Sequence, residues 1–243
     1  MVKEVAIESI FSSPFPHDFG FSYRISDSYD LGLLAAEELS LLSNKAVEKR
    51  KLHFFLGRIS AKEALAQIGI YNFPVLKGTN NEPLWPEGIC GAITHTGNIG
   101  MACVAPKAIV SGIGIDIERI TEKVSWDIVD RVCLPEEKKW VSEVPESKYQ
   151  RLLMVFSAKE SIFKALFPQN PIFFGFHEAE LLWDNSLKAF QGRLVFDFSE
   201  KFPKGYSFSV GCRVDSEYVF TYIHLQESKS NLFKESELNK FPI

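Results

Sequence analysis

Residues 111–118, which read SGIGIDIE, constrain the fold more than any other stretch of this 243-residue chain. Side chains of a β-strand alternate between two faces, so the three isoleucines point to one side and Asp116 and Glu118 to the other. Aspartate is uncommon in strands, and a row of isoleucines indicates burial. We therefore predict a central strand that carries two carboxylates on one face, about 6–7 Å apart.

Carboxylates at this spacing can reach a single divalent cation. The glycines on their face leave room for a ligand to approach the backbone. The alternative is the acidic, solvated face of an edge strand. The strand by itself leaves both interpretations open.

Residues 151–167 (RLLMVFSAKESIFKALF) predict a buried helix with a narrow polar strip. On a helical wheel at about 100° per residue, apolar side chains occupy most of the circumference. One sector holds most of the polar residues, namely Ser157, Glu160, Ser161 and Lys164. A helix that is apolar almost all round is buried, and buried charges are paired or bound to a ligand. A salt bridge between Glu160 and Lys164, one turn apart, is the alternative to a functional site.

The order of the predicted elements is helices then strands, twice over. This order predicts an α+β fold of two halves, residues 1–115 and 116–243. No internal repeat is visible by inspection, and the first 30 residues read as a wrapping arm. Helices are expected at 33–42, 46–68 and, with interruptions, 125–167, and strands at 89–95, 101–105, 109–117, 178–183, 193–198, 206–214 and 218–225.

Composition excludes several classes of protein. With 31 acidic and 27 basic side chains the net charge is −4, which argues against a nucleic-acid partner. No apolar run approaches the ~20 residues of a membrane span. The first four residues, MVKE, do not begin a secretory signal, and the four cysteines lack metal-ligand spacing. We expect a cytoplasmic protein with reduced thiols.

Several basic residues are candidates for phosphate binding. Arg50 and Arg58 are eight residues apart, about 12 Å along a helix axis and within a quarter turn, so they can hold two points of one extended ligand. Ordinary surface bases are the alternative, although Arg58 follows the apolar segment FFLG. His95 follows Thr94 near a strand end, where a lone histidine is more often a surface residue than a catalyst. His53 has no evident companion.

These motifs together resemble those of the 4'-phosphopantetheinyl transferases. GIGIDIE at 112–118 and FSAKESIFK at 156–164 are similar to the signature pair of that family. FLGRISAKEAL at 55–65 and PLWPEG at 83–88, followed by ITHT at 93–96, are similar to its double-length branch, the enterobactin synthase component D type. The resemblance covers about residues 45–180; residues 1–40 match weakly and 227–243 do not match. Thr94 stands where many relatives have serine, and keeps the hydroxyl.

The resemblance implies an activity and an architecture. The activity is transfer of the phosphopantetheine arm of coenzyme A to a serine of an apo acyl or peptidyl carrier protein, with release of adenosine 3',5'-bisphosphate. The architecture is two similar α+β halves related by a pseudo-two-fold, with the coenzyme in the cleft between them. A double-length chain contains its own cleft and is therefore expected to act as a monomer.

The resemblance also implies a role for each matched residue. Glu160 is the expected base, Lys164 the group that neutralises the pyrophosphate, and His95 a further catalytic residue. The expected Mg²⁺ ligands are Asp116, Glu118 and Glu160. The expected coenzyme-contacting residues are Arg50, Arg58, Lys77, Gly78, Thr94, His95, Asp116 and Lys164. For Lys77, an ordinary solvated loop lysine is the alternative.

Two other functions stay open at this point. A metal-dependent phosphohydrolase would also use three carboxylates, but the usual second cluster of His and Asp is missing from the sequence. A non-catalytic carrier-binding relative would be expected to have lost a metal ligand, and all three acids remain. The residues do not choose between siderophore, polyketide and fatty-acid carriers, or between Mg²⁺ and Mn²⁺. A basic run at 138–139 is a candidate docking patch for an acidic carrier, with a solvated helix face as the alternative.

Overall fold

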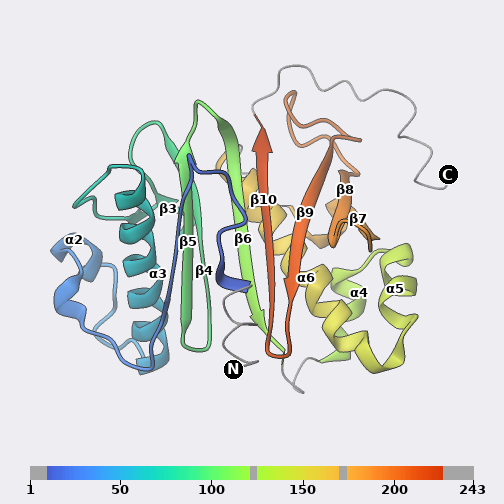
Figure 1. Ribbon diagram of the computed structural model, residues 1–243, viewed down its shortest axis with the longest axis horizontal. Coiled ribbons are helices and arrows are strands. Elements are labelled where there is room, and N and C mark those ends of the chain that lie inside the picture. The colour runs from blue at the N-terminus through green and yellow to red at the C-terminus, as the bar shows by residue number, and fades with distance from the viewer. Residues whose placement is uncertain (1–9, 121–124, 170–173, 227–243) are drawn as a thin grey trace.

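Two long helices, each packed across an antiparallel sheet, organise the molecule (Figure 1). The computed structural model describes residues 10–120, 125–169 and 174–226. In the N-terminal half, α3 (Glu48–Gln67) packs on a sheet of three strands in the order β1 (Gly20–Ile25), β5 (Ile99–Pro106) and β4 (Ile89–Thr96). In the C-terminal half, α6 (Lys148–Leu166) packs on a sheet of five strands in the order β6 (Val110–Arg119), β10 (Tyr218–Gln226), β9 (Ser207–Val214), β8 (Ala189–Leu194) and β7 (Ala179–Asp184). The α+β prediction is confirmed.

Besides the two long helices, the described residues form ten strands and several short helices. The strands are β1 (Gly20–Ile25), β2 (Leu76–Lys77), β3 (Pro83–Leu84), β4 (Ile89–Thr96), β5 (Ile99–Pro106), β6 (Val110–Arg119), β7 (Ala179–Asp184), β8 (Ala189–Leu194), β9 (Ser207–Val214) and β10 (Tyr218–Gln226). The short helices are η1 (Leu31–Leu33), α2 (Ala36–Leu39), η2 (Trp126–Ile128), α4 (Val129–Val132), α5 (Pro135–Ser142), η3 (Pro145–Ser147), η4 (Phe167–Gln169) and η5 (Phe176–Glu178). The predicted boundary at 115/116 falls inside β6.

Four sequence expectations differ from the structure. The predicted central strand, β6, is instead the end strand of its sheet and pairs with β10 alone among the described strands. Its isoleucines are buried because β4 runs beside it and the N-terminal arm covers it. The arm contains a strand, β1, which escaped notice because only its first three residues are buried and its pattern does not alternate. The predicted helix at 33–42 is reduced to η1 and α2. The predicted strand at 193–198 is displaced, because β8 ends at Leu194 and the following Phe196 and Phe198 pack into the core from a loop.

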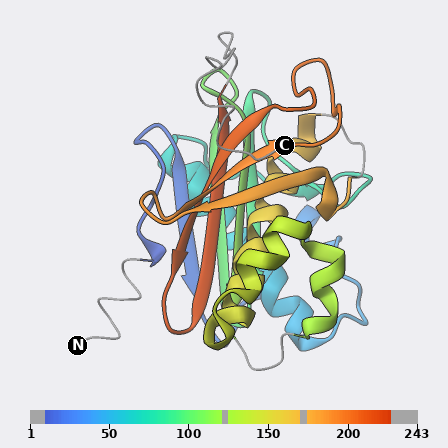
Figure 2. The same ribbon diagram turned by 90° about the vertical axis from the view of Figure 1, so that its right-hand side faces the viewer.

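The two sheets lie side by side, with β4 running along β6. Figure 2 shows the long helices on one side of this layer and the N-terminal arm on the other. Phe11 of the arm stacks on Tyr23 at 4.7 Å between ring centroids, and Phe15 packs on Tyr222 at 5.7 Å. Both belong to the same core cluster as the three isoleucines of β6. The arm thus covers the isoleucine face of β6 and joins the two halves.

The opposite face of β6 touches the backbone of α6. A Cβ added at Gly114 would lie 1.7 Å from the carbonyl oxygen of Ser161, and one at Gly112 would lie 2.2 Å from that of Ala165. The N-terminal half repeats this contact, since a Cβ at Gly20 would lie 1.9 Å from the Ala64 oxygen. The glycines therefore let strand and helix backbones meet directly, and on β6 the nearer one, Gly114, lies two residues before Asp116 on the same face.

The structure exposes an internal repeat that inspection of the sequence missed. The tetrapeptide SAKE occurs at 60–63 on α3 and at 157–160 on α6. In each half its lysine pairs with a glutamate from a short preceding helix, Lys62 with Glu38 and Lys159 with Glu137. The residue after the tetrapeptide is the one whose carbonyl meets the strand glycine. These shared features support the expectation of two similar halves.

Replacing Gly114 tests the strand–helix contact. We expect Gly114→Ala to lower the free energy of unfolding by about 3 kcal/mol or more, because the backbone atoms of Ser161 and Ala165 leave no room for a methyl group. Gly32→Ala is the control, since its Cβ would meet only the movable Asp30 carboxylate at 3.1 Å. Chemical denaturation measures both; equal losses in the two variants would contradict the assignment of this contact.

Candidate active site

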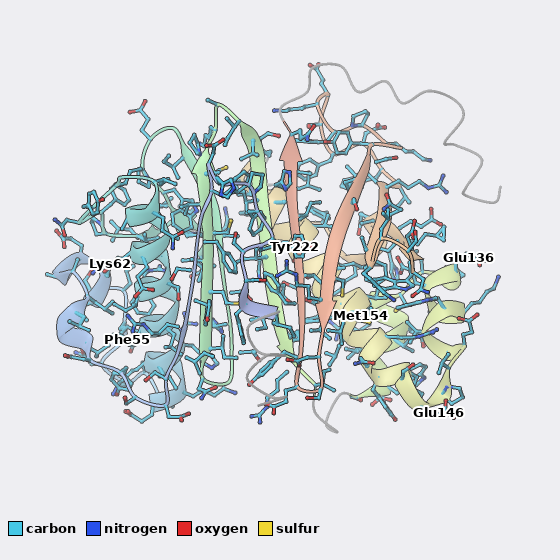
Figure 3. All side chains as sticks on the ribbon, in the orientation of Figure 1. Phe55, Lys62, Glu136, Glu146, Met154 and Tyr222 are labelled. Carbon is cyan, nitrogen blue, oxygen red and sulfur yellow. The ribbon has the colours of Figure 1, made fainter. Side chains whose placement is uncertain are left out.

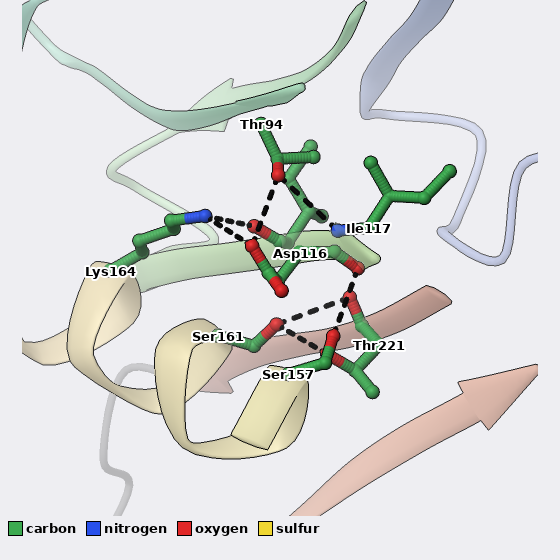
Figure 4. A network of polar contacts seen from close by, with 8 residues as sticks. Thr94, Asp116, Ile117, Ser157, Ser161, Lys164 and Thr221 are labelled. Carbon is green, nitrogen blue, oxygen red and sulfur yellow. Dashed lines mark hydrogen bonds and ion pairs between the residues drawn. The ribbon is translucent and has the colours of Figure 1, made fainter. Parts of the chain in front are cut away.

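Asp116 lies at the junction of the two halves (Figure 4). Its Oδ1 accepts a hydrogen bond from Lys164 Nζ on α6 at 2.7 Å and one from Thr94 Oγ1 on β4 at 3.1 Å. Thr94 Oγ1 also accepts from the backbone N–H of Ile117 at 3.2 Å. Lys164 therefore pairs across to the strand, and the salt bridge with Glu160 that the sequence allowed is not formed.

The two serines of the polar strip hold α6 on the sheet. Ser157 Oγ lies 2.9 Å from Thr221 Oγ1, and Ser161 Oγ lies 2.8 Å from the same atom. Ser161 Oγ also donates to the Thr221 carbonyl oxygen at 3.2 Å. The strip thus combines two purposes: its serines bind β10, while Glu160 and Lys164 point toward the cleft.

Three carboxylates gather around this junction. Glu118 follows Asp116 on the same strand face and is half-buried, as is Glu160. Burial raises the pKa of Glu118 to about 7, and the charges of Asp116 and Glu160 contribute in the same direction. Burial also raises the pKa of Glu160, with Lys164 opposing and Asp116 adding to the shift. The three acids are therefore close enough to repel one another.

These acids fit a divalent cation by their chemistry. Asp116 Oδ2 is buried and has no hydrogen-bond partner, which is costly unless a cation satisfies it. Hard oxygen donors of this kind suit Mg²⁺ or a similar ion. In the part of the chain that the structure describes, no three Asp, Glu, His or Cys side chains already stand at coordinating distance. The carboxylates would have to close on the ion.

A second group of charges, all positive, lies in the N-terminal half. Arg58 is 6% exposed, lies 4.7 Å over the Phe54 ring, and makes no ion pair with any described residue. Its Nε has no hydrogen-bond partner. Burial lowers the pKa of Arg58 to about 10, with Glu38 opposing and Arg50 adding. Lys77 lies 5.9 Å from the same ring, and its pKa is lowered by burial and by both arginines. A buried cation without a partner is typical of an anion site.

The structure gives less support to Arg50 and Gly78 as coenzyme contacts than to Arg58. Arg50 is exposed near the start of α3, close enough to affect the pKa of Arg58 and Lys77. At Gly78, the space of a Cβ is filled by the Glu82 carboxylate, 2.0 Å away. The small residue at 78 is therefore explained by the packing of the β2–β3 hairpin.

His53 lies beside the expected site residue His95, a neighbour that sequence reasoning missed. Its ring lies 4.4 Å from that of His95, and its Nε2 donates to the Gly97 carbonyl oxygen at 2.9 Å. Desolvation lowers the pKa of both rings, and the charges of His53 and Lys164 add to the shift of His95. The His95 side chain is nevertheless exposed, as the sequence suggested for a lone histidine at a strand end. The available signal was spacing, because His53 lies three residues after Arg50 on the same helix face.

A cavity of about 610 Å³ opens between the halves. Its size is within the range of ligand-binding pockets. Lys164 and Glu160 lie on its wall, whereas Thr94 and His95 continue along β4 just beyond it. Its lining residues are Thr79, Asn80, Asn81, Glu82, Pro83, Gly91, Ala92 and Ile93 from the N-terminal half, and Glu160, Phe163, Lys164, Phe167 and Pro168 from the C-terminal half. The expected cleft between the halves is confirmed.

Comparison with known proteins identifies the family. The model for the 4'-phosphopantetheinyl transferase N-terminal domain matches residues 37–105, and the model for the 4'-phosphopantetheinyl transferase superfamily matches residues 112–223. The chain belongs to the 4'-phosphopantetheinyl transferase superfamily. It is 36% identical to the transferase Svp of Streptomyces mobaraensis over 68% of this chain and 67% of that one.

Further relatives lie in the same superfamily. The chain is 29% identical to the transferase PptT of Mycobacterium tuberculosis over 80% of this chain and 85% of that one. It is 35% identical to enterobactin synthase component D of Escherichia coli over 49% of this chain and 56% of that one. As a phosphopantetheinyl transferase, it is an enzyme that transfers phosphopantetheine to carrier proteins, and neither alternative function is favoured. Among the described residues, no helix has the length and apolarity needed to span a membrane.

Glu118 gives the site a measurable pH dependence. Its folded-state pKa of about 7 exceeds the ordinary value of 4.5, so the folded protein binds this proton more tightly than the unfolded chain. Its contribution to stability is therefore complete below about pH 4.5 and is lost as the pH rises through 7. In the presence of a chelator, we expect a loss on the order of 1 kcal/mol, limited because water still reaches part of the carboxyl.

Urea denaturation at several pH values measures this loss. The E118Q variant should lack that part of the pH dependence, whereas Glu87→Gln, at an exposed position, should retain it. A pH dependence in E118Q that matches the wild type would show that Glu118 is not the group responsible.

Proposed function

We propose that this site transfers phosphopantetheine from coenzyme A to a carrier serine with Mg²⁺ held by Asp116, Glu118 and Glu160. The observation that carries the proposal is the buried Asp116 carboxylate, which keeps one oxygen without a partner where both halves meet. The adjoining cavity supports a cleft for the coenzyme. Oxygen-only ligands favour Mg²⁺ over softer transition metals.

The chemistry is phosphoryl transfer, in which positioning and charge stabilisation dominate. The carrier serine oxygen forms a bond to the β-phosphorus of coenzyme A, and the bond from that phosphorus to the bridging oxygen breaks, releasing adenosine 3',5'-bisphosphate. Glu160 accepts the serine proton. Lys164, which reaches into the same junction, balances negative charge on the pyrophosphate. When bound, the ion would neutralise charge on the pyrophosphate oxygens.

The positive group supplies coenzyme recognition in this proposal. Arg58 and Lys77, both close to the Phe54 ring, together with the exposed Arg50, bind phosphate oxygens of coenzyme A. His95, steadied by His53, acts beside the pyrophosphate, where an anion would favour its protonated form. In this proposal, the basic residues of the N-terminal half bind one part of coenzyme A, and the acids of the C-terminal half lie at its pyrophosphate.

Two broader features support the proposed setting. Both walls of the cavity come from one chain, which supports a monomeric enzyme. All four cysteines are free and buried, which suits the reducing cytoplasm.

The basic run at 138–139 is a weaker docking candidate than its sequence implies. Lys138 pairs with Asp130 at 2.6 Å, and Lys139 pairs with Glu136 at the same distance. Each positive charge is therefore offset by a nearby acid on α4 or α5. A role in attracting an acidic carrier remains a prediction.

Intact-mass spectrometry of candidate apo-carriers tests the proposed function. With coenzyme A and Mg²⁺, we expect the carrier mass to rise by one phosphopantetheine group. Asp116→Ala should abolish the transfer while the protein stays folded, because losing an acid from the cluster removes a ligand and also relieves repulsion. The matched control is Asp130→Ala, which removes an exposed carboxylate. Transfer by the D116A variant at the wild-type rate would refute the metal assignment.

Arg58 is tested through the 3'-phosphate of coenzyme A. We expect Arg58→Ala to raise the KM for coenzyme A by about tenfold or more and to change kcat less, because the arginine binds a phosphate that does not react. Lys51→Ala is the control, since Lys51 lies on the same helix and pairs with Glu48. If R58A still discriminates between coenzyme A and its 3'-dephospho form as strongly as the wild type, Arg58 does not read that phosphate.

A further inference from the structure

A buried ion pair directly beside Glu160 has no part in the chemistry described so far. Lys159 Nζ lies 2.7 Å from Glu137 Oε2, and both side chains are almost completely buried. Lys159 also donates to the carbonyl oxygen of Val132 at 2.7 Å. Glu137 accepts from the backbone N–H groups of Leu134 at 2.6 Å and Leu181 at 2.9 Å.

These bonds join four elements at one point. Val132 is the last residue of α4, Leu134 is the N-cap of α5, and Leu181 lies on β7. Lys159 brings in α6. Figures 1 and 2 show α4 and α5 on the outer side of α6, away from the N-terminal half. The pair therefore fastens this outer lobe to the helix that carries Glu160.

Glu160 depends on that helix for its position. Among the described residues, no hydrogen bond or ion pair holds the Glu160 carboxylate; only the more distant charges of Lys164 and Asp116 act on it, and it lines the cavity. Neighbouring side chains on a helix point about 100° apart, so an anchored Lys159 sets the direction of Glu160. The repeat in the N-terminal half differs at this point. There Glu63 is held directly, by Ser22 Oγ at 2.6 Å and by Arg24.

We propose that the Lys159–Glu137 pair is a positioning device that holds Glu160 in its reactive direction. Lys159 does not touch the substrate; it acts through the helix turn that it shares with Glu160. The inference rests on the proposed role of Glu160 as base and metal ligand. It assigns a function to the one charged residue of the motif 157–164 that lies outside the polar strip.

The internal repeat provides a matched control. Lys62 lies on the α2 side of α3 (Figure 3) and pairs with Glu38 at 3.5 Å, in the same sequence context. Glu38 accepts from the backbone N–H groups of Ala35 and Val75, just as Glu137 does from two backbone groups. The lysine at 62 precedes a glutamate that is away from the cavity. Its loss should disturb folding without disturbing catalysis.

The experiment compares K159M, K159R and K62M in the carrier-modification assay, with kcat expressed per folded molecule. We expect K159M to lower kcat by about ten- to a hundredfold, because a small misplacement of a reacting group has effects of this size. The KM for coenzyme A should stay within about threefold, since the cationic group is untouched. K159R should recover most of kcat, and K62M should keep it while losing thermal stability.

Two outcomes would overturn the proposal. One is folded K159M with kcat within about twofold of the wild type; the other is an equal loss of kcat in K62M. If K159M does not fold, the double variant K159M/E137Q removes both buried charges and keeps an acceptor for Leu134 or Leu181. The same loss of kcat is expected there, and unchanged kcat would equally refute the inference. Failure of the wild type to modify any carrier would instead count against the proposed function.

Discussion

The direct contact between the backbones of β6 and α6 is the constraint on which the rest of the site depends. Gly112 and Gly114 remove the side chains that would keep strand and helix apart. Without that approach, Lys164 on α6 would not reach the Asp116 carboxylate at 2.7 Å. Ser157 and Ser161 then fix the helix on β10 through Thr221. A packing contact of the core thus sets the distances of the polar junction.

The two halves repeat one design but differ in the charged groups that they contribute near their junction. Both place a long helix on an antiparallel sheet and seat a lysine of the repeated SAKE segment against a buried glutamate. The N-terminal half contributes the unpaired Arg58 with Lys77, and the C-terminal half contributes the three acids. An extended phosphate ligand with a bound cation would suit these two groups, because the basic residues can offset phosphate charge and the acids can hold the cation.

The last residue of the repeated segment SAKE has a different environment in each half, as Glu63 and Glu160 show. Glu63 is paired with Arg24 on β1, while Glu160 forms no hydrogen bond or ion pair with the described residues. Burial and mutual repulsion raise the pKa of Glu118 and of Glu160. Glu63 of the first half is therefore part of an ion pair, whereas the acids of the second half repel one another. Such clusters of groups with shifted pKa values are typical of functional sites.

The sequence by itself determined the buried strand β6, the two long helices and the placing of Asp116 and Glu118 on one strand face, because alternation and helical periodicity are local properties of the chain. It did not determine that β6 ends its sheet, since burial by β4 and by the arm produces the same isoleucine pattern as a central position. It did not determine the partner of Lys164, since an i,i+4 pair with Glu160 and a pair with Asp116 satisfy the same pattern. The place of His53 beside His95, the contact of β4 with β6 through Thr94, and the burial of Lys159 against Glu137 were decided only by tertiary packing. Each joins residues from different elements, and the energy of such contacts depends on distances that no local spacing encodes.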